Sequence, residues 1–163
     1  MAKHIRISLE NEEISMTARL LEKKAPETSR AVWNNLPVTD DVHHAKWAGR
    51  ELYTLVPPFD DLPGTENATI TPIPGDICYF FVHSSSIDLP VETRERYPDG
   101  LVDLAVFYGR NNLLIGPEGA MPGNVFARAV DNLDEFADAC ARLFREGYAD
   151  ETLRFERAPG YEE

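Results

Sequence analysis

Two polar side chains that could bind a ligand or exchange a proton stand close together in the first third of this sequence. His44 and Lys46 are two residues apart, so they share one face if the chain is extended there. A histidine exchanges a proton near neutral pH, and a lysine carries a positive charge and three hydrogen-bond donors. This spacing predicts a donor-rich patch suited to a small polar or anionic molecule.

Four more residues complete the predicted ligand-binding set: Glu66, Asn67, Tyr108 and Asn124. Glu66 and Asn67 begin a predicted strand, where capping of a turn explains them as well as function does. Tyr108 could present its hydroxyl to a ligand or only pack its ring, and Asn124 could bind a ligand or hold a loop backbone. We expect His44, Lys46 and these four residues to line one cleft.

Other chemistry has little support in the sequence. There is no Gly-x-Ser-x-Gly motif for a nucleophilic serine, no Cys-x-x-Cys or His-x-x-x-His spacing, and no P-loop lysine after residues 116–119. His43 and His44 are adjacent, so in a strand they point to opposite faces and cannot hold one ion. We therefore expect no metal and no cofactor, and the residues of any catalysis are unknown.

Composition predicts one acidic, soluble domain over residues 1–163. The chain has 28 acidic and 16 basic residues and a formal net charge of −12, which argues against a nucleic-acid partner or an anionic membrane surface. The first residues lack the apolar segment of a secretory signal, and no apolar run could cross a bilayer, so a cytoplasmic location is expected. Cys78 and Cys140 fall in apolar patterns typical of buried free thiols.

Hydrophobic periodicity predicts strands with two helices. Residues 5–9 and 14–20 alternate as a hairpin, and Pro26 starts a helix that Pro37 ends at Leu36. The further expected elements are a strand over 42–56 broken at Gly49, strands over 67–71, 76–82 and 101–108, an inserted segment over 83–100, an irregular loop over 109–123, a helix after Asn132, an edge strand over 152–156 and a frayed tail over 159–163.

The last helix carries the clearest amphipathic pattern. Asn132 and Glu135 resemble a capping box, and Gly147 suits the position after the helix end. Its apolar stripe comprises Leu133, Phe136, Ala137, Cys140, Leu143 and Phe144. Elsewhere, Trp47 is expected in the core because an indole ring buries a large apolar area.

Several segments resemble the cyclophilins, and more of them resemble a bacterial family of unknown function with a cyclophilin-like fold. Residues 25–33 (APETSRAVW) and 123–133 (GNVFARAVDNL) are similar to the two helix-bearing corners of cyclophilin. The bacterial family's pattern is carried by residues 44–49 (HAKWAG), 66–69 (ENAT), 74–76 (PGD), 107–109 (FYG) and 123–127 (GNVFA). The resemblance implies a mainly β protein, a cyclophilin-like closed eight-stranded antiparallel β-barrel capped by two α-helices. It implies no known reaction.

Prolyl isomerisation is not expected. The corresponding cyclophilin strand carries Phe-His-Arg and then a Gln-Gly-Gly-Asp-Phe segment, whereas this chain offers only His44 and Lys46. A lysine is a point charge and does not replace the fork of an arginine. The expected function is binding of a small polar or anionic metabolite in a cleft at the side of the barrel.

Two alternatives stay open. In the first, the chain is an enzyme or enzyme subunit acting on amide or small-acid substrates, with His44 as acid–base group and Glu66 hydrogen-bonded to it. In the second, it is an oligomeric scaffold whose contact surface is formed by Trp33 or by the loop 57–62. A homo-oligomer is compatible with either.

Overall fold

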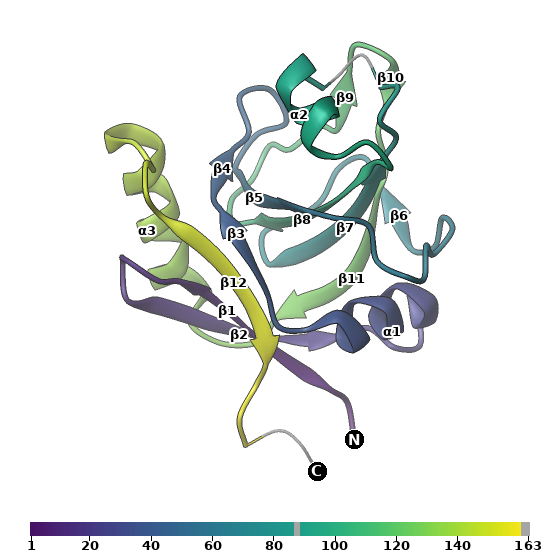
Figure 1. The fold of residues 1–163 in the computed structure, drawn as a ribbon. Helices are drawn as coiled ribbons and strands as arrows, with labels where there is room; N and C mark the ends of the chain where they lie inside the picture. The colour runs from purple at the N-terminus through teal and green to yellow at the C-terminus, as the bar shows by residue number, and fades with distance from the viewer. Residues whose placement is uncertain (87–88, 161–163) are drawn as a thin grey trace.

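The computed structural model of the chain describes residues 1–86 and 89–160. Residues 87–88 of the predicted insertion and residues 161–163 of the predicted tail lie outside the described residues. Figure 1 shows strands wrapped around the middle of the molecule, with helix α1 (Pro26–Asn35) and helix α3 (Leu133–Glu146) on two different sides.

The predicted N-terminal hairpin is confirmed. Strands β1 (His4–Leu9) and β2 (Ile14–Leu20) are antiparallel, with Ile7 opposite Met16. Their alternate apolar residues are buried because each strand has one face toward the core and one toward solvent.

The large sheet is antiparallel throughout. Its strands are hydrogen-bonded in the order β3-β12-β1-β2-β11-β7-β8-β5-β4, and β6 pairs with β11. The strands not yet given are β3 (Val38–Asp41), β4 (His43–His44), β5 (Glu51–Val56), β6 (Ala68–Thr69), β7 (Asp76–Val82), β8 (Leu101–Phe107), β11 (Gly123–Ala129) and β12 (Thr152–Arg157).

The two ends of this strand order are consecutive in the chain. β3 pairs with β12, β4 pairs with β5, and only Val42 separates β3 from β4. The Thr54 hydroxyl of β5 also donates a hydrogen bond to the Asp41 carbonyl oxygen at 2.9 Å. The segment 38–44 therefore contacts both β12 and β5.

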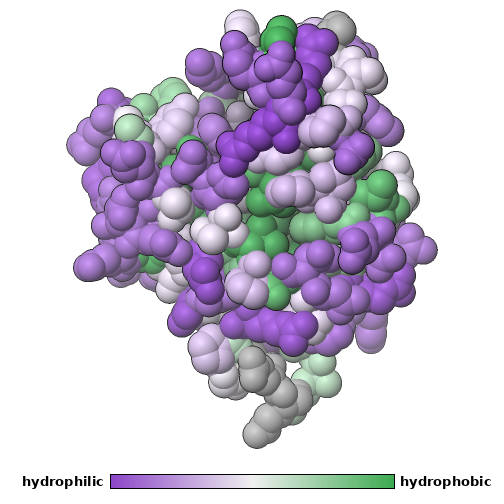
Figure 2. Space-filling model, viewed as in Figure 1, coloured by the Kyte–Doolittle hydropathy of each residue, from purple (hydrophilic) through white to green (hydrophobic). Residues whose placement is uncertain are grey.

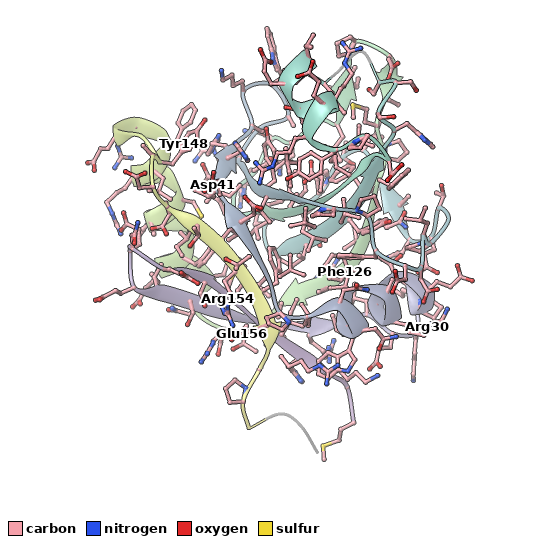
Figure 3. All side chains as sticks on the ribbon, viewed as in Figure 1. Arg30, Asp41, Phe126, Tyr148, Arg154 and Glu156 are labelled. Atoms are coloured by element: carbon pink, nitrogen blue, oxygen red, sulfur yellow. The ribbon has the colours of Figure 1, made fainter. Side chains whose placement is uncertain are left out.

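Several predicted strand limits are wrong. The expected strand over 42–56 is interrupted by a loop over residues 45–50, and the expected strand over 67–71 contains only β6. The segment 152–156 is not an edge strand, because β12 pairs with β1 on one side and β3 on the other. Figure 3 shows Arg154 and Glu156 side by side on this strand, where their side chains form an ion pair.

Two segments for which no helix or strand was predicted contain short elements. The insertion holds helix α2 (Val91–Arg96). The loop over 109–123 holds a small hairpin of β9 (Ile115–Gly116) and β10 (Gly119–Ala120). Both lie at the upper end of the molecule in Figure 1.

The two predicted helices are present, with differences at α3. Helix α1 ends before Pro37 as expected, and it buries Thr28 and Val32. At α3, Asn132 makes no capping bond; its backbone is left-handed, and its side-chain amide donates to the Ser15 carbonyl oxygen. Phe144 is 60% exposed because it lies at the border of the buried stripe formed by Phe136, Ala139, Cys140 and Leu143.

Apolar side chains gather on both faces of the sheet. The larger cluster lies between the sheet and the helices α1 and α3 and includes Ile7, Phe126 and Phe136. The smaller cluster, on the other face of β7, β8 and β11, comprises Cys78, Ala105, Phe107, Leu114 and Val125. Figure 2 shows hydrophobic residues near the centre of one face of the molecule, surrounded by hydrophilic ones.

Three further predictions concern single residues and membrane spans. Cys78 and Cys140 are buried free thiols, as predicted. Trp47 is not in the core: it is 91% exposed, because it lies in the loop that interrupts the expected strand. Among the described residues, no helix has the length and apolar character needed to span a membrane.

Candidate functional site

The six predicted site residues fall into two hydrogen-bonded groups and one separate residue. His44 and Tyr108 form the first group, and Glu66 and Asn124 belong to the second, beside which Asn67 is hydrogen-bonded to Val125 of β11. Lys46 is exposed in the loop over 45–50, and none of the hydrogen bonds described here involves its side chain.

The first group is buried in the large cluster. The Ala45 carbonyl oxygen lies 2.6 Å from His44 Nδ1 and can only accept, so Nδ1 carries the proton. Nε2 then accepts a hydrogen bond from the Tyr108 hydroxyl at 2.6 Å. The Phe144 ring of α3 stacks on the imidazole at 4.3 Å between centroids.

Burial keeps both members of this pair neutral. It lowers the pKa of His44, opposed by the hydrogen bond to the Ala45 carbonyl. Burial also raises the pKa of Tyr108 to about 12. Because Ala45 and Tyr108 occupy the two ring nitrogens, the His44–Glu66 hydrogen bond required by the enzyme alternative is not formed.

The second group joins the start of α1 to β11. The Glu66 carboxylate accepts a hydrogen bond from the Thr28 backbone N–H in the first turn of α1, where a negative charge stabilises the helix. Asn124 Oδ1 accepts from the Glu66 backbone N–H at 3.2 Å. The Asn124 side-chain amide donates to the Thr28 hydroxyl at 3.1 Å and to the Gly64 carbonyl oxygen at 2.8 Å.

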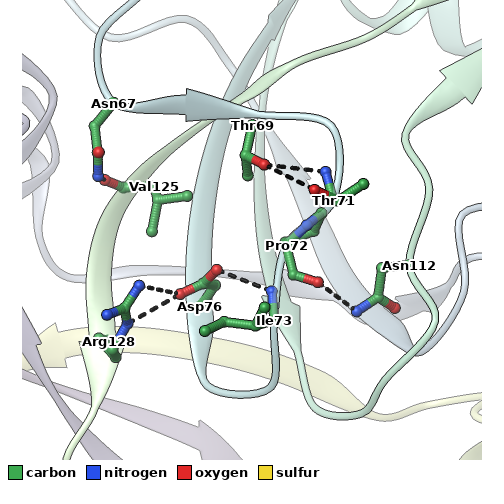
Figure 4. Close-up of polar contacts among 9 residues, drawn as sticks. All are labelled: Asn67, Thr69, Thr71, Pro72, Ile73, Asp76, Asn112, Val125 and Arg128. Carbon is green, nitrogen blue, oxygen red and sulfur yellow. Dashed lines mark hydrogen bonds and ion pairs between the residues drawn. The ribbon is translucent and has the colours of Figure 1, made fainter.

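Asn67 takes a structural position beside this group. Its backbone has a positive φ of 46°, which asparagine tolerates better than most residues. Its side-chain amide donates to the Val125 carbonyl oxygen at 2.8 Å, and Figure 4 shows the two residues facing each other. Asn67 therefore fixes the loop before β6 against β11.

A cleft of about 350 Å³ opens next to the second group. Asn124 is the one member of the predicted set that lines it, and the end of β7 forms much of its wall. The lining residues are Pro63, Gly64, Thr65, Tyr79, Phe80, Phe81, Val82, His83, Met121, Pro122 and Asn124. Tyr79 is 3% exposed, and its buried hydroxyl has no hydrogen-bond partner among the described residues.

A smaller pocket of about 100 Å³ adjoins the cleft, because Phe80, Val82 and Met121 line both. It also contains two carboxyl groups, Glu51 of β5 and Asp103 of β8. Burial raises the pKa of Glu51 to about 7, and burial together with Glu51 raises the pKa of Asp103 well above its usual range. Such shifts are frequent at functional sites.

The sequence reasoning missed Tyr79, Glu51 and Asp103. Tyr79 and Asp103 belong to strands whose sequences predict burial on both faces. A polar side chain without an obvious partner in such a strand could have indicated a functional site. Glu51 begins β5 directly after the loop, a position that normally suggests exposure.

The two adjacent histidines lie on opposite faces, as predicted. His43 stacks on Tyr53, which packs against the smaller cluster, whereas His44 contacts Tyr108 of the larger cluster. Within residues 1–86 and 89–160, no group of three or more histidine, cysteine or acidic side chains is arranged to hold a metal ion.

Comparisons with known proteins identify a family and similar folds. The pattern of a family described as a protein of unknown function (DUF3830) matches residues 7–155. No curated protein matches the chain.

Two solved structures are similar to this chain. The structure of McbB in complex with tryptophan has a TM-score of 0.64 and 21% sequence identity; the match covers 95% of this chain and 45% of McbB. This chain therefore spans less than half the length of McbB. The solution structure of the hypothetical protein AF2241 from Archaeoglobus fulgidus has a TM-score of 0.51 and 22% identity, over 96% of this chain and 95% of that one. At these identities the likeness shows the fold alone.

Proposed function

Because the chain belongs to the DUF3830 family, whose description assigns no function, we propose from its own geometry that it binds a small polar metabolite in the cleft beside β7 and β11. The buried Tyr79 hydroxyl carries this proposal. A buried hydroxyl without a partner is costly, and a ligand that accepts its hydrogen bond would remove that cost.

Asn124 is the proposed second polar contact. It is buried at the edge of the cleft, and the Thr28 hydroxyl and the Gly64 carbonyl oxygen hold its amide in one orientation. A side chain fixed in this way can recognise a ligand without losing much conformational entropy. Glu66 and Asn67 take the role of positioning residues in this proposal, because they hold the backbone on either side of Asn124.

The other predicted residues have different proposed roles. We propose that His44 and Tyr108 hold β4, β8 and α3 together. Their polar atoms form hydrogen bonds with each other and with the Ala45 carbonyl oxygen, so they are not free to bind a ligand. We propose that Lys46 approaches a bound ligand from the loop that also supplies Ala48 to the smaller pocket. An anionic ligand has less support than a neutral or cationic one, because Glu51 and Asp103 are the ionisable groups in that pocket.

We also propose that the sheet closes into a cyclophilin-like barrel of eight strands. The support is the segment 38–44, which pairs with β12 through β3 and with β5 through β4. If β3 and β4 count as one strand, every strand of the path then has two neighbours, apart from the short β6 that pairs with β11. A closed sheet has no free edge and gives the cleft rigid walls.

The neighbour McbB, which is described in complex with tryptophan, supports trying free amino acids as first probes. The proposal includes a cytoplasmic location, in keeping with two buried free thiols. It includes no prolyl isomerase activity, since the residues for that reaction are missing from the sequence.

The test is calorimetric binding of tryptophan and the other free amino acids to the wild-type protein and two variants. Tyr79→Phe removes only the hydroxyl, so we expect unchanged or higher stability without ligand and at least about tenfold weaker binding. Tyr148→Phe is the matched control, because Tyr148 does not line the cleft. Equal affinity of Tyr79→Phe and wild type would contradict the proposal.

A further inference from the structure

We propose that the smaller pocket binds a primary ammonium group of the ligand between the carboxyl groups of Glu51 and Asp103. This inference rests on the proposed function, because the remainder of such a ligand would occupy the adjoining cleft. It narrows the ligand class from small polar molecules to small amines with an apolar body.

The sheet register places both carboxyl groups on the same face of the sheet. In the β5–β8 pair, Glu51 lies opposite Phe107 and Leu55 lies opposite Asp103. Residues two apart along a strand share a face, so Glu51, Leu55, Asp103 and Phe107 all belong to one face. Both acidic side chains line the same pocket of about 100 Å³.

Among the described residues, neither carboxyl group takes part in a hydrogen bond or an ion pair. Glu51 is 5% exposed, and Asp103 Oδ1 is buried without a hydrogen-bond partner among the described residues. Within the described residues, lysine and arginine side chains form ion pairs with acidic residues other than Glu51 and Asp103. Arg128, for example, pairs with Asp76. Two buried, unpaired carboxyl groups are unfavourable for folding, so a role outside folding is the physical reason to keep them.

Tyr79 is a separate observation beside the same ligand space. It lines the cleft that shares Phe80, Val82 and Met121 with the smaller pocket, and its hydroxyl is buried and unpartnered among the described residues, on the side of β7 that faces the larger cluster. The cleft therefore contributes the polar residues Tyr79 and Asn124, and the smaller pocket contributes Glu51 and Asp103. This distribution matches a ligand with a cationic end, an apolar body and a hydrogen-bond acceptor.

An ammonium group fits the pocket better than the other cations do. It offers three donors to carboxyl oxygens, and its neighbouring methylene groups suit the apolar wall of Ala48, Leu114 and Met121. The volume corresponds to about three water-sized groups of roughly 30 Å³ each. Divalent metal ions prefer more oxygen ligands than two carboxyl groups supply.

The protonation of these carboxyl groups should change when an ammonium ion binds, and this change can be measured. Burial raises the pKa of Glu51 to about 7, and burial together with Glu51 raises the pKa of Asp103 well above its usual range. The groups close enough to affect them, Tyr53 and Cys78, also have pKa values raised by burial and stay neutral. At about pH 6 the Glu51 carboxyl group is therefore mostly protonated, and binding of an ammonium ion would release a proton as this group ionises.

The experiment measures binding of 2-phenylethylamine, 2-phenylethanol and 3-phenylpropionate by calorimetry, in two buffers of different ionisation enthalpy. For the wild type we expect the amine to bind at least about tenfold more tightly than the alcohol and to release protons. In Glu51→Gln and Asp103→Asn, the affinity for the amine should fall to about the affinity for the alcohol. Glu92→Gln removes the same charge from the exposed start of α2 and should change nothing.

Each other result overturns the inference in a distinguishable way. If amine and alcohol bind equally, and Tyr79→Phe weakens both, the ammonium site is wrong while the proposed function stands. If Ca²⁺ alone binds and Glu51→Gln abolishes it, the pocket is a metal site instead. If neither the three probes nor the free amino acids bind, both proposals fail.

Discussion

The Phe80 ring lies directly over Gly123, so that a Cβ atom added to Gly123 would stand 2.6 Å from Phe80 Cζ. Phe80 lines both the cleft and the smaller pocket, and Gly123 immediately precedes Asn124. Because Gly123 has no side chain, the Phe80 ring can occupy its position between the cleft and the smaller pocket. Two segments distant in the sequence, β7 and β11, meet at this contact.

Gly123→Ala should displace Phe80 and reshape the site. We expect a loss of about 1–3 kcal/mol in the free energy of unfolding, from forced overpacking, and weaker binding of any cleft ligand. Urea denaturation and calorimetry measure the two effects. Gly64→Ala is the control for stability, since nothing lies within 4 Å of its added Cβ; equal stability of the two variants would contradict this account.

Tyr108→Phe should destabilise the protein without affecting the cleft. The change leaves the buried His44 Nε2 without its donor, which costs about 1–3 kcal/mol. Ligand affinity should stay within about twofold of wild type, because neither residue lines the cleft. A large loss of ligand affinity in Tyr108→Phe at unchanged stability would contradict this account and would indicate that His44 and Tyr108 belong to the ligand site.

Thr28→Val should weaken binding from a position that does not line the cleft. Valine keeps the shape of threonine but cannot accept the hydrogen bond from the Asn124 amide. We expect a loss of about 1–2 kcal/mol in stability and a several-fold loss in affinity, since Asn124 is less well held. Thr39→Val, at an exposed position of β3, should change neither quantity. Unchanged affinity in Thr28→Val would show that Asn124 needs no such support.

The buried Glu51 should make stability fall as the pH rises. Its pKa is 4.5 in the unfolded chain and about 7 in the folded protein, so the unfolded state loses its proton first. Stability contributed by the protonated group is present below pH 4.5 and lost by about pH 7, on the order of 3 kcal/mol. Urea denaturation across this range should show a flatter profile for Glu51→Gln. Parallel profiles would mean that Glu51 is solvated or paired.

Local pattern was sufficient to predict the N-terminal hairpin and the two longer helices, whereas tertiary pairing decided the limits and places of the other strands. The alternation of residues 5–9 and 14–20 and the stripe of α3 were correctly read, because each pattern reports one buried face. The position of β12 between β1 and β3 was not, since it depends on the segment 38–41, for which no strand was predicted. Trp47 shows the same limit: its size suggested the core, but a loop carries it to the surface.

The candidate site was predicted in part for a similar reason. Polar residues next to glycines and strand ends were visible in the sequence, and Asn124 among them lines the cleft. Glu51, Tyr79 and Asp103 were missed because alternation in a strand assigns a polar side chain to solvent unless the other face is known to be covered. At Glu51 and Asp103, the β9–β10 hairpin and its flanking residues cover that face, and no hydrophobic periodicity predicts such a cover.

The most direct test of ligand binding is a nuclear magnetic resonance titration of the isotope-labelled protein with the free amino acids and 2-phenylethylamine. We expect saturable shifts of backbone amide signals concentrated in residues 63–65, 79–83 and 121–124, which surround the cleft. Saturable shifts confined to other parts of the chain, or no saturable shift with any of these compounds, would contradict the account.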